Sequence, residues 1–143
     1  MERGNRRFYG GLGEMHRAEE AASLFHSLAR AEETHGDALA RLYLKLVQRK
    51  LPRGFPDSEI PGDGTDRMEG GLTVAECLAW ARGKPPGEAL ELAMSLEVNS
   101  YDLYLTMHRL ARDEEAREVF FALAEEEKLH LERLTRAFEA TLG

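Results

Sequence analysis

Cysteine is almost absent from this chain of 143 residues, which contains only Cys77. A disulfide framework within the chain is therefore excluded, and so is a metal centre built on Cys-x-x-Cys pairs. No apolar run is long enough to span a membrane, and the first residues lack the apolar segment of a signal peptide. We therefore expect a cytoplasmic protein in a reducing environment, with no membrane partner.

Positive charge is also scarce, since 19 Lys and Arg residues stand against 26 Asp and Glu residues and the net charge is −7. A nucleic-acid partner is not expected, because little here would neutralise phosphate groups. Charged residues form 31% of the chain and hydrophobic residues 43%, which is ordinary for a soluble helical protein. The length suits one domain, residues 1–143, with a core of its own.

Apolar residues recur at alternating steps of three and four, which predicts amphipathic helices near residues 2–16, 17–50, 87–112 and 113–142. Prolines and several glycines gather in residues 51–86, which form a long connection. Within it, Thr73 and Glu76 make a capping box that opens a short helix over 73–82. The predicted fold is all-α: an antiparallel four-helix bundle whose second and third long helices are joined by a crossover carrying the extra helix.

Two halves of the chain, residues 2–50 and 87–142, match when the sequence is shifted by 95 positions. Each half has a lone Glu and, further along, a Glu-x-x-His motif. On a helix the two ends of that motif share a face, so one turn presents a carboxylate and an imidazole to the same point. All of these residues occupy inward positions of otherwise apolar stripes. The six candidate metal ligands are Glu2, Glu32 and His35 in the first half, and Glu97, Glu127 and His130 in the second.

Four carboxylates and two imidazoles at the centre of one bundle require a counter-charge, because buried unpaired charges are very costly. Two divalent cations about 3.5–4 Å apart would supply it, with Glu32 and Glu127 as the expected bridging carboxylates. These donors suit iron and manganese and also admit zinc. A single Glu-x-x-His is a weak signal, since surface helices often produce it, whereas two matched copies with two lone Glu residues strongly favour a dimetal site.

Other polar side chains near this pattern have more ordinary interpretations. Tyr9 and Tyr104 lie seven residues after the lone Glu of their helices, where they either hydrogen-bond a ligand carboxylate or simply pack in the core. Cys77 and Trp80 are expected on the buried face of the short helix. The side chains expected to be solvated or to pack, and not to bind metal, are His16, His26, His108, Glu33, Glu126 and Glu132. No catalytic residue is assigned.

The first helix is the weakest predicted element, because it contains four glycines, each costing about 1 kcal/mol relative to alanine. Those glycines are Gly4, Gly10, Gly11 and Gly13. A short first helix would leave apolar stripes of its longer partners uncovered. We therefore expect either a homodimer or an N-terminal segment beyond this sequence, which would make the chain part of a longer protein.

The stretch from Glu97 to Tyr104, together with Phe120 to His130, resembles the second half of proteins in the rubrerythrin branch of the ferritin-like superfamily. The stretch from Ala21 to His35 resembles the metal helix of their first half. The chain is also similar to the ferritin-like domain found fused behind rhodanese domains. The resemblance covers nearly the whole chain. It implies a ferritin-like fold, two bound iron ions and often a dimer.

Two departures from the rubrerythrin pattern matter for function. Met94 stands where rubrerythrins carry a further Glu, which implies the more symmetric kind of site, with His130 serving the second metal. A rubredoxin domain is missing, so a peroxidase would need an external electron-donor protein. The resemblance thus implies a di-iron oxidoreductase that reduces hydrogen peroxide or oxygen, as in the response to oxidative stress. Two alternatives stay open: iron binding, storage or metal sensing without turnover, and a structural remnant that holds no metal.

Overall fold

A computed structural model describes residues 2–17, 20–50, 68 and 72–143. In these ranges the structure contains five α-helices and no strand, which confirms the all-α prediction. The helices are α1 (Glu2–Met15), α2 (Ala21–Lys50), α3 (Val74–Ala81), α4 (Pro86–Leu110) and α5 (Glu114–Leu142). Most of the predicted crossover, residues 51–67 and 69–71, lies outside the described residues. None of the helices carries an apolar stretch long enough to cross a lipid bilayer.

Local sequence explains where two of the helices begin. The Thr73 hydroxyl accepts a hydrogen bond from the Glu76 backbone N–H at 3.2 Å, and Glu76 Oε2 accepts one from the Thr73 backbone N–H at 3.1 Å. This capping box opens α3, as the sequence predicted. At the start of α5, Asp113 Oδ2 accepts from the Ala116 backbone N–H at 3.0 Å. Both caps satisfy backbone donors that a helix leaves unpaired in its first turn.

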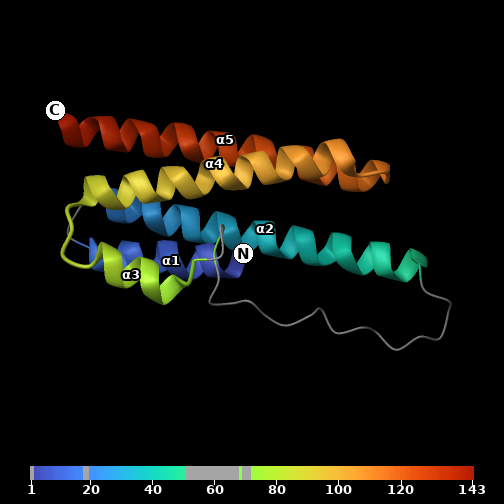
Figure 1. Ribbon diagram of the computed structural model, residues 1–143, viewed down its shortest axis with the longest axis horizontal. Helices are drawn as coiled ribbons and strands as arrows, with labels where there is room; N and C mark the ends of the chain where they lie inside the picture. The colour runs from blue at the N-terminus through green and yellow to red at the C-terminus, as the bar shows by residue number, and fades with distance from the viewer. Residues whose placement is uncertain (1, 18–19, 51–67, 69–71) are drawn as a thin grey trace.

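The long helices form two hairpins whose axes follow the long dimension of the molecule (Figure 1). α1 and α2 run side by side in opposite directions, and so do α4 and α5. α2 and α4 run in the same direction, so the chain returns between them to the end from which α2 started. α3 lies against α1, and α2 packs against α5 across the two hairpins. This arrangement places the middles of α2, α4 and α5 close together.

The apolar interior has two parts. The larger part draws residues from all five helices, and its largest fully buried members are Tyr9, Phe8, Phe25, Leu12, Leu28, Leu90 and Leu134. The smaller part consists of Tyr104, Leu123 and Ala124, with partly buried neighbours such as Leu39. Along α2, α4 and α5 the buried polar residues come between these two parts in sequence. A polar centre is therefore enclosed between apolar layers.

Two glycines of α1 permit close approach of neighbouring helices. A Cβ on Gly11 would stand 2.7 Å from Leu78 Cδ2 of α3, and a Cβ on Gly13 would stand 2.6 Å from His26 Cε1 of α2. These glycines therefore have a role in packing. From the sequence alone, only their cost to helix stability could be predicted. On α3 the prediction for Cys77 is confirmed, since it is buried, but the prediction for Trp80 is wrong. Trp80 stands at the solvent side of the helix and is 45% exposed.

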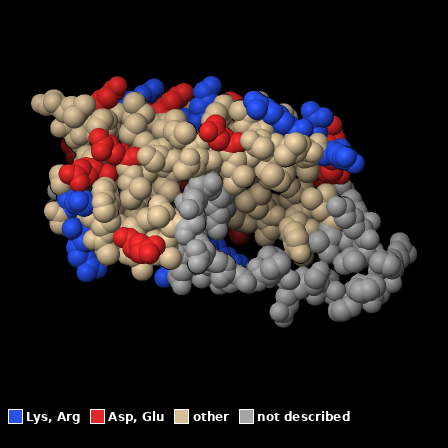
Figure 2. All heavy atoms as spheres, in the orientation of Figure 1, with Lys and Arg blue, Asp and Glu red and all other residues tan. Residues whose placement is uncertain are grey.

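Charges of both signs are interspersed over the face of the molecule drawn in Figure 2. Ion pairs also join neighbouring helices, such as Arg6 of α1 with Glu33 of α2, at 3.2 Å. Both partners of that pair are about half exposed, so it contributes little to stability. The described part of this face therefore presents no extended field of one sign.

Candidate metal centre

Five of the six predicted ligands meet at the centre of the molecule. α2 contributes Glu32 and His35, α4 contributes Glu97, and α5 contributes Glu127 and His130. All five are buried, His130 being the most exposed at 7%. The sixth, Glu2, is the first residue of α1, but its side chain lies outside the described residues. Helical spacing explains the grouping, because Glu and His three positions apart project from the same face of α2 and of α5.

Four of these residues can offer one ligand atom each with all four atoms within 4.8 Å of one another: Glu32, Glu97, Glu127 and His130. Glu127 lies between the two imidazoles. Its Oε1 is 3.0 Å from His35 Nδ1, and its Oε2 is 3.3 Å from His130 Nδ1. The two rings are stacked, with centroids 5.5 Å apart and an interplanar angle of 20°. Glu127 thus contacts both imidazoles, one with each of its carboxylate oxygens.

The outer carboxylates are also near the imidazoles. Glu32 Oε2 lies 3.7 Å from His35 Nδ1, and Glu97 Oε2 lies 3.6 Å from His130 Nδ1. Each half of the site thus pairs one carboxylate with one imidazole. The approximate two-fold symmetry of the sequence is present in the described part of the centre.

Tyr9 of α1 closes one side of this centre. Its hydroxyl donates a hydrogen bond to Glu97 Oε1 at 2.6 Å, and both side chains are buried. Burial, followed by the nearby charges of Glu97 and Glu32, raises the pKa of Tyr9 well above its ordinary value, so the phenol keeps its proton. Tyr104 is buried as well and stacks on Phe120, with ring centroids 6.4 Å apart. Tyr9 therefore has a direct hydrogen bond to a candidate ligand.

Glu126 belongs to the site although the sequence placed it in solvent. Its Oε2 lies 2.7 Å from His35 Nε2, the ring nitrogen that faces away from the cluster. The Glu126 side chain remains 53% exposed, so the contact joins a buried imidazole to the surface. Helical periodicity could not reveal it, because the partner is on another helix and Glu126 is off the inward stripe of its own helix. The only signal in the sequence was that Glu126 directly precedes Glu127.

The carboxylates and imidazoles perturb one another's ionisation. Burial raises the pKa of Glu97 to about 8, with His130 opposing the rise and Glu127 adding to it. Burial would also raise the pKa of Glu127, but hydrogen bonding with His130 and His35 outweighs it and holds that pKa well below the ordinary value. Against the effect of burial, Glu127 and Glu97 raise the pKa of His130 to about 9. At neutral pH, therefore, Glu127 is ionised while Glu97 and His130 each hold a proton.

Protons on Glu97 and His130 thus offset part of the negative charge of the centre when no cation is bound. Glu97 Oε2 is among the buried polar atoms that have no hydrogen-bond partner among the described residues. Such an orphaned buried acceptor is costly unless a proton or a cation neutralises it. Carboxylate and imidazole donors converging within a few ångströms fit a divalent transition metal in place of those protons. The residues present are therefore able to hold a metal ion.

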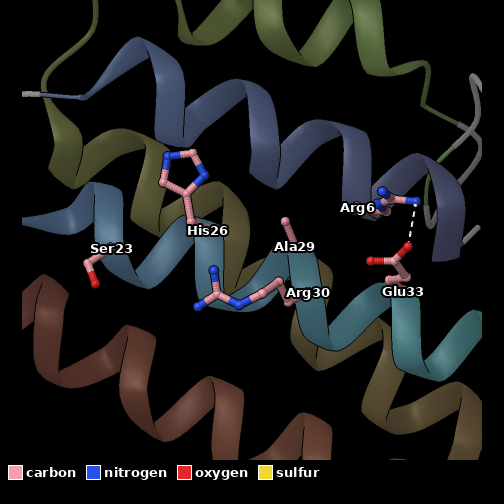
Figure 3. A pocket seen from close by; sticks show the side chains of 6 residues that line it. All are labelled: Arg6, Ser23, His26, Ala29, Arg30 and Glu33. Carbon is pink, nitrogen blue, oxygen red and sulfur yellow. Dashed lines mark ion pairs between the residues drawn. The ribbon is translucent and has the colours of Figure 1, made fainter.

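Two surface hollows open on the helices that carry the centre. One, of about 500 Å³, opens on α1 and α2 and is drawn in Figure 3; it is lined by Arg6, Ser23, His26, Ala29, Arg30 and Glu33. The other, of about 400 Å³, is lined by Glu126, Leu129, His130, Glu132, Arg133 and Arg136. Because His130 belongs to both the second hollow and the buried cluster, that hollow is where the described centre comes nearest to solvent.

Comparison with known protein families, curated proteins and solved structures finds no match to this chain. The chemistry and geometry of the buried centre therefore carry the functional argument.

Proposed function

We propose that this chain is a dimetal protein of rubrerythrin type. In this proposal α1, α2, α4 and α5 form a ferritin-like antiparallel four-helix bundle, and the connection between α2 and α4 is its crossover. The observation that carries the proposal is the buried meeting of three carboxylates and two imidazoles from three helices. Two iron ions are the proposed occupants, and manganese or zinc would suit the same donors.

The proposed ligand roles follow the distances within the cluster. Glu32 and His35 would hold one ion, and Glu97 and His130 the other. Glu32 and Glu127 are the proposed bridging carboxylates, and each oxygen of Glu127 faces one imidazole. Glu2 is proposed as the sixth ligand on the strength of its place in the repeat. With the three described carboxylates ionised and both imidazoles neutral, the protein would contribute three negative charges, which two divalent cations more than offset.

Bound as a ferrous pair, iron would supply the two electrons that convert one hydrogen peroxide molecule and two protons into two water molecules. The protein's own residues would then manage protons and solvent. The Tyr9 hydroxyl keeps a proton 2.6 Å from the Glu97 carboxylate, and the apolar layers on either side exclude bulk water. Returning the iron to its ferrous state requires a donor, and Cys77, the one cysteine, is buried in α3. An external electron-donor protein is therefore part of the proposal, in a reducing, cytoplasmic setting.

Anaerobic iron loading followed by peroxide tests this function. The metal-free protein is given ferrous iron, iron content is measured, and hydrogen peroxide is added with and without a supplied reductant. The expected result is two irons per chain and repeated peroxide consumption with the reductant. The double variant Glu32→Ala with Glu127→Ala should lose the iron, while Glu125→Ala, which removes an exposed acid of α5, should keep it.

Each outcome of this experiment distinguishes one candidate function. A single oxidation with ferric iron retained would indicate storage or sensing in place of turnover. No iron uptake by the folded protein would mean a structural remnant and would reject the metal proposal. Unchanged iron content in the double variant would show that the metal lies elsewhere.

A homodimer is proposed on separate grounds. α1 has 14 residues, whereas α2 has 30 and α5 has 29, so α1 spans only part of their length. Large apolar side chains are exposed where α4 passes into α5, namely Met107, Leu110 and Phe121. A second copy covering this end would remove them from water. Light scattering over a dilution series should show a dimer that dissociates on dilution, and a monomer at all concentrations would exclude it.

A further inference from the structure

The two imidazoles of the centre differ in what stands behind them. His35 turns Nδ1 toward the cluster, 3.0 Å from Glu127 Oε1, and places Nε2 2.7 Å from Glu126 Oε2. An ionised carboxylate can only accept a hydrogen bond, so Nε2 is the nitrogen that carries the hydrogen. In neutral His35 the lone pair is then on Nδ1, facing the cluster. Glu126 therefore sets both the orientation and the tautomer of His35.

The repeat does not provide the same support for His130. The residue 95 positions before Glu126 is Ala31, which has no polar side-chain atom. His130 instead borders the surface hollow of about 400 Å³ that Leu129 and Arg133 also line. Its exposed fraction is 7%, against 1% for His35. One imidazole is thus held by a carboxylate behind it, and the other is open to solvent at its edge.

We propose that Glu126 makes the two metal positions unequal, so that the ion held through His35 binds more tightly and exchanges more slowly than the ion held through His130. The inference rests on the proposed dimetal function. A carboxylate behind a metal-binding imidazole holds the ring in place and raises its basicity, and losing such a partner typically weakens metal binding about 10–100-fold. Glu126 acts through His35 and is therefore a positioning residue.

Unequal positions give the centre an order of loading. The His35 position fills first and remains filled, whereas the His130 position, beside the hollow, fills last and empties first. The second position then governs how much of the protein carries a complete pair at a given concentration of metal. The sequence repeat, which is nearly symmetric in the ligands, hides this asymmetry because it resides in Glu126 and Ala31.

Titration of the metal-free protein with Co²⁺ tests the inference, because the ion is stable in air and its visible spectrum reports each binding step. The unaltered chain should bind two ions in separate steps. Glu126→Ala should weaken the tighter step by about 10–100-fold and leave the weaker step unchanged. Glu126→Gln should fall between them, since its amide oxygen can still accept the Nε2 hydrogen without the charge. Glu125→Ala is the matched control for losing a neighbouring exposed acid of α5.

A second measurement needs no metal. Proton and nitrogen-15 NMR of the imidazoles should show the His35 Nε2–H hydrogen shifted downfield and slow to exchange with water in the unaltered metal-free chain, and both effects should be lost in Glu126→Ala, with His130 unchanged. Equal weakening of both Co²⁺ steps in Glu126→Ala, or no weakening, would overturn the inference while leaving the proposed function intact. Failure of the unaltered chain to bind Co²⁺ would overturn both. An unchanged His35 Nε2–H resonance in Glu126→Ala would exclude the positioning role of Glu126.

Discussion

Metal binding at this centre should release the protons that Glu97 and His130 hold. At neutral pH the metal-free site holds protons on Glu97, with a pKa of about 8, and on His130, with a pKa of about 9. Both groups must lose their protons to become ligands. The perturbation that tests this relation is Glu97→Gln, which fixes residue 97 in an uncharged form similar in shape to the protonated acid.

The expected magnitude follows from the two pKa values. At pH 7 a group with a pKa one unit higher is about nine-tenths protonated, and a group two units higher is almost fully protonated. Together Glu97 and His130 should therefore release about two protons per chain when metal binds. Glu127 contributes none, because its carboxylate is already ionised. Glu97→Gln should release about one proton fewer than the unaltered chain.

Calorimetric titration with Zn²⁺ in buffers of different ionisation enthalpy measures this number without redox chemistry. The quantity of interest is the difference in proton release between Glu97→Gln and the unaltered chain, because protons lost from metal-bound water are common to both. Glu125→Gln, which removes one exposed acid of α5, should behave as the unaltered chain. Equal proton release by Glu97→Gln and the unaltered chain would refute the reasoning, since Glu97 would then not carry the proton that the metal displaces.

Three further predictions concern the metal-free protein. Tyr9→Phe removes the hydroxyl that donates to Glu97 at 2.6 Å, and urea unfolding should show a free energy of unfolding lower by about 1–3 kcal/mol. Tyr101→Phe on α4 is the control, and equal effects of the two variants would contradict the role of this hydrogen bond. Folding stability should fall as pH rises from 4.5 to 9, because Glu97 has its pKa raised from 4.5 to about 8 and His130 from 6.5 to about 9, so that the fold favours both protonated forms. A urea midpoint that rises with pH over this range would contradict the prediction. Gly10→Ala should stabilise α1 by about 0.5–1 kcal/mol, because its new Cβ meets nothing within 4 Å. Gly11→Ala should raise the melting temperature less, because its Cβ would stand 2.7 Å from Leu78 Cδ2. A larger rise for Gly11→Ala than for Gly10→Ala would exclude close packing of α3 at Gly11.

Much of the helical structure could be predicted because its signals are local. The Thr73–Glu76 capping box and the Asp113 N-cap involve residues three positions apart, so the sequence alone indicates where α3 and α5 begin. The grouping of Glu32 with His35, and of Glu127 with His130, was equally accessible, because a helix places such pairs on one face. Repetition of the pattern at a distance of 95 residues then predicted that the pairs would meet.

The features that could not be predicted depend on distances between helices. Glu126 differs from Glu127 by one position and falls off the inward stripe, yet its carboxylate reaches His35 on α2. Whether it does so depends on how far α5 lies from α2, which helical periodicity does not specify. Gly11 and Gly13 could not be interpreted from sequence for the same reason, because they leave room for the side chains of Leu78 and His26 on other helices. Intrinsic helix propensity records only their cost.

The position of the buried centre also bears on how the fold opens. α1 packs chiefly on α2, and α4 on α5, while contact between the two hairpins is sparser. Tyr9 with Glu97, and His35 with Glu126, join one hairpin to the other. The ionisation of the centre can therefore decide whether the two hairpins open separately or as one cooperative unit, because these contacts lie on the boundary between the hairpins. Amide hydrogen exchange along α2 and α5 would therefore report the ionisation of the centre, even in a chain whose activity cannot be measured.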